Sequence, residues 1–427
     1  MALVLTGTLA ALIAAGCSSS KPSSTATTGS SATTASGGTT ATTGGSTTNT
    51  ASDVGVTTNS IKVGFITSVT GNASSTFSDS AGGAMAAFAA QNAAGGVNGR
   101  KIVMVTADDG SSPAGNATAS QSLESQNIFA LERFSPYDFG GFKATSGIPT
   151  TGGGFDGPEW ATAPNMFSTT GDTNGRTSNN TEQANFFKGI GVTNVGALAY
   201  GISPSSTGSV QDLKTALQAI GLRMGYENLS VPFGGVDVTG YILAMKQAGV
   251  NGAACSCVQS TTLAMFTGLA QAGMSNVKAL SFASADSSVF ASATTAQAAQ
   301  GAYYVSQIPP LDQNNSATNT MVANLKQYDP SYKGGYPTFG ATGAYLAAEL
   351  MIKGLQEAGP NPTRVSFITN MRTVTSWDAN GLLASAVAFN NPGHSQPTRC
   401  SYYVQVKGND FVSNTVNGGK PVCGTSF

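Results

Sequence analysis

The sequence predicts an α/β protein built from two doubly wound lobes. Strand-like and helix-like segments alternate with a repeat of roughly 30 to 40 residues, the pattern of parallel sheets covered by helices. The first repeat, residues 61–109, reads as strand, helix and strand, which is one complete βαβ unit. At 427 residues, 40% of them hydrophobic, the chain is long enough to bury more than one core.

The opening unit starts with the apolar stretch IKVGFITSVTG, continues through AGGAMAAFAAQNAAGGVNG and ends with RKIVMVTADDG. Its first turn, residues 69–73, lacks the G-x-G-x-x-G pattern that holds a dinucleotide. A helix over 113–126 and a buried strand over 128–131 follow, and the loop 132–138 comes at the carboxyl end of that strand. Ligands of parallel sheets bind at this edge, so we expect the chemistry of the protein there.

A second series of units begins near Thr181. Its expected helices are 181–189, 208–220, 239–248 and 261–271, and its expected strands are 195–200, 228–231, 250–258, 277–282 and 301–305. Beyond Pro310 the pattern changes to helices at 319–327, 339–354 and 363–371, then to a strand-like tail at 382–383, 386–389 and 402–406.

Composition and charge exclude several functions. The net charge of -1 and pI near 5.8 give no electrostatic footprint for nucleic acid or an anionic membrane surface. The sequence contains one histidine, His394, and no G-x-S-x-G, H-E-x-x-H or Walker motif. We expect no enzyme activity, no cofactor and no metal site; hydrolysis by carboxylates alone is the remaining enzymatic alternative.

The amino terminus predicts export. Residues 2–15 form an apolar run suited to a signal peptide, and Ile13-Ala14-Ala15-Gly16-Cys17 resembles a bacterial lipobox. This resemblance implies a signal peptide at 1–17 and lipidation of Cys17; an ordinary cleaved signal with an incidental cysteine is the alternative. Residues 18–51 are almost wholly Ser, Thr, Gly and Ala, so we expect a disordered tether over 18–56. The protein would then be extracytoplasmic and held at the outer face of the cell membrane.

Four cysteines remain after Cys17. In an oxidising compartment we expect Cys400 to pair with Cys423, which would staple the tail. Cys255 and Cys257 lie on one face of an expected strand, near the upper limit of distance for a bridge. A strained disulfide and two free thiols are both open for that pair.

The order of segments resembles a known family. IKVGFITSVTG, AGGAMAAFAAQNAAGGVNGRKI, ADDGSSP, LAMFTGLAQAGM and YPTFGATGAYLAAELM together resemble the type I periplasmic solute-binding proteins, in particular the branched-chain amino acid and amide binders of ABC importers. The resemblance covers about residues 61–427. It implies two Rossmann-like lobes joined by three crossovers, one lobe from 57–178 with 307–375 and the other from 179–306 with 376–427. It also implies a small polar ligand held between them.

The resemblance also implies the ligand contacts. They are Thr76, Phe77, Ser135, Gly153, Gly154, Phe155, Ser205, Ser206, Gln259 and Asp286. Phe77 would lie over the ligand, Ser135 would receive its carboxylate within a backbone cradle made by residues 153–155, and Asp286 would pair with its amino group. Ser205 and Ser206 stand where amino acid binders commonly carry tyrosine, which weakens a leucine-like assignment.

Each of these positions also has a purely structural interpretation. Phe77 can staple a helix start, Ser135 can satisfy a turn, the three glycines 152–154 can form a tight connection, and Asp286 can cap the next helix. For Asp108-Asp109 we favour a solvated turn over a metal or acid-base site, and for Glu132-Arg133 an ion pair over an anion-binding arginine.

Function follows from the lipobox, the tether and the two lobes together. We expect a monomeric solute-binding lipoprotein whose partners are a small ligand, an ABC permease and the membrane that holds its lipid, with no nucleic acid. A ligand sensor or cell-surface interaction protein of the same fold is the alternative, because permease docking has no readable motif.

Overall fold

The computed structural model describes residues 48–170, 180–390 and 400–426, all within one compact unit, Thr47–Phe427. The predicted signal peptide, Cys17 and residues 18–47 of the predicted tether lie outside the described residues, as does His394. Across the described ranges, no helix is both long enough and apolar enough to span a membrane.

The first sheet has five parallel strands in the order β2-β1-β3-β4-β5. They are β1 (Ser60–Thr67), β2 (Lys101–Asp108), β3 (Ala130–Phe134), β4 (Thr150–Gly152) and β5 (Met166–Ser168). Every residue of β3 is buried, which is expected of a parallel strand with helices on both faces. The predicted βαβ unit is therefore confirmed as the start of a parallel sheet.

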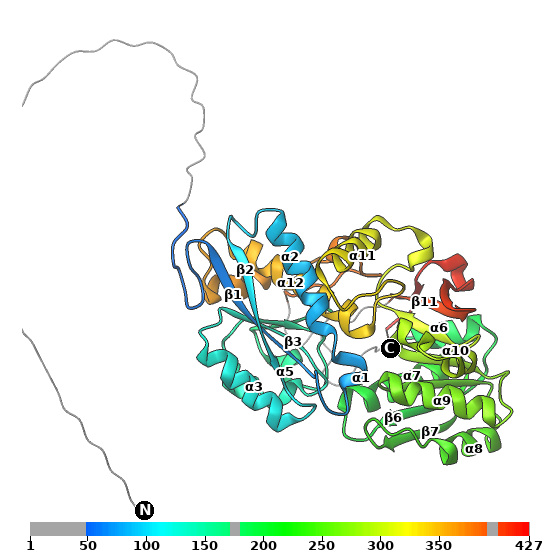
Figure 1. Cartoon of the computed structure of the whole chain (residues 1–427). Coiled ribbons are helices and arrows are strands. Elements are labelled where there is room, and N and C mark those ends of the chain that lie inside the picture. The colour runs from blue at the N-terminus through cyan, green and yellow to red at the C-terminus, as the bar shows by residue number, and fades with distance from the viewer. Residues whose placement is uncertain (1–47, 171–179, 391–399, 427) are drawn as a thin grey trace, which may run out of the picture. The chain divides into compact units, whose positions relative to one another are not determined.

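Helices cover both faces of this sheet (Figure 1). On one face, α2 (Ser80–Ala93) packs against α12 (Phe339–Glu357), which also contacts β3 and β4; α3 (Pro113–Ser125) packs against β1 and β2. A Cβ atom added at Gly83 of α2 would lie 2.0 Å from the carbonyl oxygen of Ala341. The close approach of α2 and α12 therefore requires glycine at this position.

The second sheet runs in the order β12-β11-β10-β9-β8-β6-β7, with β13 beside β11. Its strands are β6 (Asn194–Tyr200), β7 (Arg223–Val231), β8 (Gly252–Ser256), β9 (Lys278–Ser284), β10 (Tyr303–Ser306), β11 (Cys400–Lys407), β12 (Asp410–Ser413) and β13 (Val422–Cys423). Strands β6 to β10 are mutually parallel, whereas β11 is antiparallel to β10. Helices α6 (Glu182–Gly189), α7 (Pro204–Ala219), α8 (Thr239–Gln247), α9 (Gln259–Gln271) and α10 (Ala293–Ala298) belong to this second lobe.

Two elements of the second lobe begin earlier than predicted. Helix α7 starts at Pro204, not at residue 208, because the Ser203 side chain accepts a hydrogen bond from Ser206 N (3.1 Å) and proline suits the first helical position. Strand β7 starts at Arg223, not at residue 228, because Arg223 already pairs with Asn194 of β6. Local capping and sheet pairing extend both elements beyond their apolar residues.

The chain crosses between the two sheets three times. It passes to the second sheet between β5 and α6, returns after β10 to form α11 (Ser316–Tyr328), α12 and α13 (Arg364–Met371), and passes again before β11. The first and third crossings run through residues outside the described ranges. Two doubly wound lobes are confirmed.

The expected boundary near residue 376 differs from the structure. Residues 377–389 pack on the first lobe: the Phe389 ring lies 5.9 Å from that of Phe167 in β5, and Arg372 Nη1 donates to Phe389 O (3.1 Å). The strands predicted at 382–383 and 386–389 are reduced to a single bridge between Trp377 and Val387. The apolar side chains of this segment pack beside β5 and α13, and its backbone does not join either sheet.

The predicted tether is also too long at its carboxyl end. Arg364 N donates to Asp53 Oδ2 (2.7 Å), Arg100 Nη2 donates to Thr50 O (2.7 Å), and Val56 is buried and forms a bridge with Ile61. Residues 50–56 therefore belong to the folded body, because backbone polar groups and one valine find partners there.

Two disulfides are present. Cys400 in β11 is bonded to Cys423 in β13, directly opposite it in the antiparallel pair, with Cα atoms 4.0 Å apart. Cys255 and Cys257 are bonded to each other at the carboxyl end of β8, with Cα atoms 5.2 Å apart. Of the two states open for the second pair, the structure has the bridged one.

Candidate functional site

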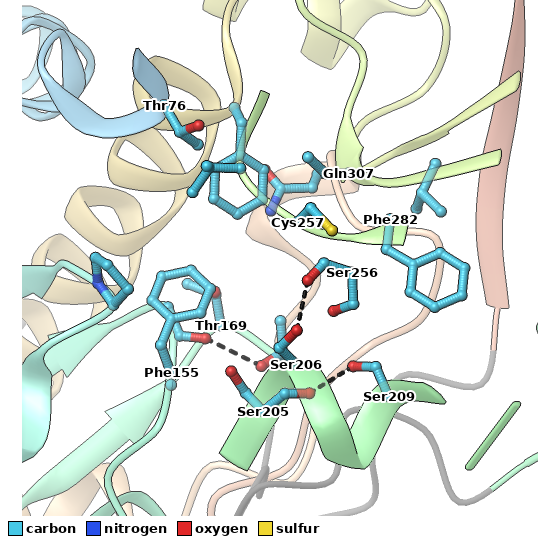
Figure 2. Close-up of a pocket in the computed structure, with 18 of the residues that line it drawn as sticks. Thr76, Phe155, Thr169, Ser205, Ser206, Ser209, Ser256, Cys257, Phe282 and Gln307 are labelled. Atoms are coloured by element: carbon cyan, nitrogen blue, oxygen red, sulfur yellow. Dashed lines mark hydrogen bonds between the residues drawn. The ribbon is translucent and has the colours of Figure 1, made fainter. Parts of the chain in front are cut away.

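A cavity of about 280 Å³ lies between the carboxyl ends of the two sets of strands (Figure 2). The first lobe contributes the end of α1 (Ser74–Phe77), the loop after β4 and the start of α12. The second lobe contributes the loops after β6, β7, β8 and β10, together with Glu182 and Gln183 of α6. This is the edge at which parallel α/β sheets bind ligands.

Four phenylalanine rings form the wall on the first lobe. Phe77, Phe134, Phe155 and Phe339 contact one another in all six pairs, with ring centroids 5.2 to 5.9 Å apart. Phe134 is fully buried beneath the other three, which line the cavity. We call these four residues the phenylalanine tetrad.

The wall on the second lobe combines aromatic rings with serine hydroxyls. The Tyr200 and Phe233 rings are 4.6 Å apart, and Tyr200 donates from its hydroxyl to Thr261 Oγ1 (2.6 Å). Burial raises the pKa of Tyr200 to about 12, so its hydroxyl stays protonated. Ser206 Oγ donates to Ser256 O (2.5 Å), and Ser209 Oγ donates to Ser205 O (2.8 Å), as Figure 2 shows.

Asp156 of the first lobe reaches the amino terminus of α7 in the second. Its Oδ1 accepts hydrogen bonds from Ser203 Oγ (2.9 Å) and Ser205 N (2.8 Å), and its side chain is buried. Burial raises the pKa of Asp156, while the hydrogen bonds from Ser205 and Ser203 oppose that shift. A helix amino terminus favours a carboxylate, and here the protein supplies its own.

A second direct bond joins the lobes at the other side of the cavity. The backbone N–H of Gln259, the first residue of α9, donates to Thr76 Oγ1 (3.0 Å) in α1. With the bonds of Asp156, this contact holds the two walls against each other in the described structure.

Glu182 lies where the cavity meets the last strands of the second sheet. It accepts a hydrogen bond from the Tyr403 hydroxyl, and Tyr403 stacks on Phe186 with ring centroids 3.7 Å apart. Burial raises the pKa of Glu182 to about 8, against the lowering effect of hydrogen bonds from Tyr403 and Ser401. At neutral pH this carboxyl is mainly protonated and uncharged.

Seven of the ten residues predicted from the sequence line the cavity. They are Thr76, Phe77, Gly153, Gly154, Phe155, Ser205 and Ser206. Of the three predicted glycines at 152–154, only Gly154 has a positive φ, +73°, and the N–H of Gly153 donates to Arg133 O (3.3 Å). The cradle is thus less open to a ligand than three glycines suggested.

Ser135, Gln259 and Asp286 do not line the cavity. Ser135 is fully buried and donates to Asp109 Oδ2, which fits its alternative role of satisfying a turn. Asp286 accepts from Ser288 N (2.8 Å) and caps a short 3-10 helix, Ser287–Phe290, which is also its alternative role. The Gln259 side chain points toward the Tyr304 hydroxyl, 3.4 Å away.

Of the two predictions about charged pairs, one is correct only in part and the other is wrong. Asp108 is exposed, but Asp109 is buried and accepts from Ser68 Oγ (2.7 Å) and Asn116 Nδ2 (3.1 Å), so only half of the pair is a solvated turn. Glu132 and Arg133 are both fully buried but are neighbours in β3, so they point to opposite faces and form no ion pair.

Arg133 is used inside the first lobe. It donates to Asp138 O (2.6 Å) and Thr145 Oγ1 (2.6 Å), and none of these three residues lines the cavity. The residues that sequence reasoning missed include Asp156, Glu182, Tyr200, Phe233 and Phe339. Their position in the fold could have identified them, since most of them lie at the end of a strand or at the start of the helix that faces it.

Comparisons with known proteins agree with this architecture. Residues 60–411 match the family described as Periplasmic binding protein. Comparison with curated protein sequences gave no match.

Solved structures share the fold at low identity. A branched-chain amino acid ABC transporter protein from Thermus thermophilus, with bound valine, has a TM-score of 0.71 and 15% identity, covering 85% of this chain and 96% of its own. A fatty acid ABC transporter substrate-binding protein from Thermomonospora curvata has a TM-score of 0.70 and 17% identity, covering 88% and 94%. A solute-binding protein from R. palustris, in complex with benzoate, has a TM-score of 0.67 and 16% identity, covering 86% and 98%. With the family match over residues 60–411 and two doubly wound lobes around a cavity, the chain belongs to the type I periplasmic binding proteins.

Proposed function

We propose that this protein is an extracytoplasmic solute-binding lipoprotein that captures one small organic solute and delivers it to an ABC importer. The observation that carries the proposal is the cavity of about 280 Å³ whose wall comes from both lobes. A solute enclosed there contacts both lobes at once and so stabilises the closed form over the open one. Binding and release require no covalent bond to form or break, so the proposed function includes no enzyme activity.

The proposed ligand contacts are the cavity-lining residues. On the first lobe they are Thr76, Phe77 and the segment 153–155; on the second they are Ser205 and Ser206. An amino acid or amide is the ligand class expected from the sequence. That expectation assigned the ligand carboxylate to Ser135 and its amino group to Asp286, and both side chains are engaged elsewhere. An amino acid therefore has less support than a small solute in general.

A thermal-shift screen tests solute binding. The purified full chain is heated with branched-chain amino acids, small amides, urea, aromatic acids and aromatic alcohols, because a ligand of the folded state alone raises the melting temperature. Phe77→Ala should abolish the shift of any true ligand while leaving the ligand-free melting curve cooperative. No shift from any solute class would overturn the proposal.

Lipid anchoring and transport need separate experiments. We propose that Cys17 carries the lipid, with part of residues 18–49 as the tether, so Cys17→Ser should move the protein from the membrane fraction to the soluble fraction. Uptake of a bound solute by vesicles that contain the permease would support delivery. Binding without uptake would favour a sensor.

A further inference from the structure

The cavity is lined mainly by apolar and aromatic groups. Six aromatic side chains face it: Phe77, Phe155, Tyr200, Phe233, Phe282 and Phe339. Val258, Val305 and Leu346 add aliphatic surface. Aromatic rings in walls on both sides favour a flat apolar ligand, which they can contact by edge or by face.

The wall offers little to a charged ligand. Among the described residues that line the cavity, none is lysine, arginine or histidine. The amino terminus of α7 would attract a carboxylate, but Asp156 already accepts from Ser203 and Ser205 there. A ligand carboxylate would have to displace Asp156 or lie beside it, and both cost binding energy.

The same wall offers no well-placed anion for an ammonium group. The carboxylate of Asp156 is committed to α7, and the carboxyl of Glu182 is mainly protonated at neutral pH because burial raises its pKa to about 8. Neither end of an amino acid zwitterion therefore finds a free partner of opposite charge among the described lining residues.

Two polar groups of the wall lack hydrogen-bond partners among the described residues, and each could accept from a donor on the ligand. Gln307, after β10, lines the cavity, and its Oε1 atom is buried with no hydrogen-bond partner in the described part of the chain. The same holds for Gln183 Oε1 in α6. Buried acceptors without donors are costly, so a ligand with an O–H group would gain by donating to one of them.

We infer that the ligand is an uncharged aromatic solute: one ring bearing one or two hydroxyl groups, with no carboxylate and no ammonium. The inference rests on the proposed solute-binding function and names its substrate class. Size agrees with it, since a dry cavity of roughly 150 Å³ holds benzene. The 280 Å³ available here leaves room for one ring with small substituents.

The first experiment compares a matched pair of probes by isothermal titration of the full chain at pH 7. 4-Hydroxybenzyl alcohol and 4-hydroxybenzoate share ring and phenol and differ in charge; leucine is the third probe. We expect the alcohol to bind at least tenfold more tightly than the other two. Equal or tighter binding of the carboxylate or of leucine would overturn the inference and leave the proposed function intact. Absence of binding by all three, and by every class in the thermal-shift screen, would overturn both.

The second experiment tests the role of Asp156. Asp156→Ala vacates the amino terminus of α7, so the affinity for 4-hydroxybenzoate should rise at least tenfold. Asp237→Ala is the matched control, because exposed Asp237 accepts from Thr239 N (3.2 Å) at the start of α8, away from the cavity lining. Asp156→Asn provides a second variant if the alanine variant unfolds. Unchanged carboxylate affinity in a folded Asp156 variant would contradict exclusion of anions by this residue.

Discussion

The ring of Phe134 occupies the space that a side chain at Gly343 would need. A Cβ atom added at Gly343 of α12 would lie 1.9 Å from Phe134 Cζ. Phe134 in turn supports the three other rings of the phenylalanine tetrad, each with its centroid within 5.7 Å of it. The absence of a side chain at Gly343 therefore determines the position of Phe134 and, through it, the positions of the three rings that line the cavity.

Gly343→Ala should destabilise the first lobe. Overpacking of a filled core typically costs about 1–3 kcal/mol, and urea unfolding measures it. Gly240→Ala in α8 is the control, because an added Cβ there meets nothing within 4 Å. At this exposed position of α8, alanine should stabilise the protein by up to about 1 kcal/mol. If Gly343→Ala has the same free energy of unfolding as Gly240→Ala, α12 and Phe134 can move apart without loss of stability.

Glu132→Gln should make the protein more stable at neutral pH. Glu132 is fully buried, and neither of its carboxylate oxygens has a hydrogen-bond partner among the described residues. Burial raises the pKa of Glu132 well above its ordinary value. The folded state therefore keeps this proton after the unfolded state has released it.

The sign of the pH dependence follows. The stabilising effect of this retained proton is complete below the unfolded pKa of about 4.3 and is lost as pH rises toward the folded pKa, by at most about 1.4 kcal/mol per pH unit. As the pH rises from 4 to 8, the free energy of unfolding of the wild type should fall relative to that of Glu132→Gln. Exposed Glu124→Gln, the control, should track the wild type. Parallel curves for all three proteins would show that Glu132 is solvated.

Thr76→Val should favour the open form. Valine matches the shape of threonine but cannot accept from Gln259 N, and an unpaired buried N–H costs about 1–3 kcal/mol. Ligand affinity should drop about tenfold, and small-angle scattering should report a larger radius of gyration. Thr118→Val is the control, since the hydroxyl of exposed Thr118 donates to Ala114 O within α3. If scattering and affinity are unchanged, closure does not depend on this bond.

Replacing both Cys400 and Cys423 by serine should lower the melting temperature more than replacing both Cys255 and Cys257. A cross-link over 23 residues restricts the unfolded chain by about 3 kcal/mol, whereas one over 2 residues restricts it far less. Calorimetry of the two double variants makes the comparison. The reverse order would mean that the β8 bridge acts through the folded state.

The sequence was sufficient for the fold because apolar periodicity and capping agree along most of the chain. Helix α12 begins at Phe339 as predicted, since Thr338 caps it by accepting from Ala341 N (3.0 Å). Prediction failed where tertiary pairing decides the outcome, as for β7, whose polar residues are held by β6. The strands predicted within residues 377–389 were wrong for a related reason, because the apolar side chains of this segment pack on the first lobe.

The site was predictable by position but not by side-chain direction. Residues after strands β1, β4 and β6 were placed correctly beside the cavity, because topology alone brings those ends together. Ser135 was misplaced because Asp109, 26 positions away, draws its hydroxyl inward. Asp156 was missed because nothing local indicates that a carboxylate will cap a helix of the other lobe.

The origin of β11, β12 and β13 affects the order in which the protein can fold during synthesis. These strands follow α11, α12 and α13 in the chain, yet they complete the edge of a sheet that begins at β6. Thr181 N, at the start of α6, also donates a hydrogen bond to Thr425 O near the end of the chain (3.1 Å). A ribosome-bound chain can therefore finish its first lobe while the second lobe still lacks its edge, its Cys400–Cys423 bridge and the Tyr403 partner of Glu182.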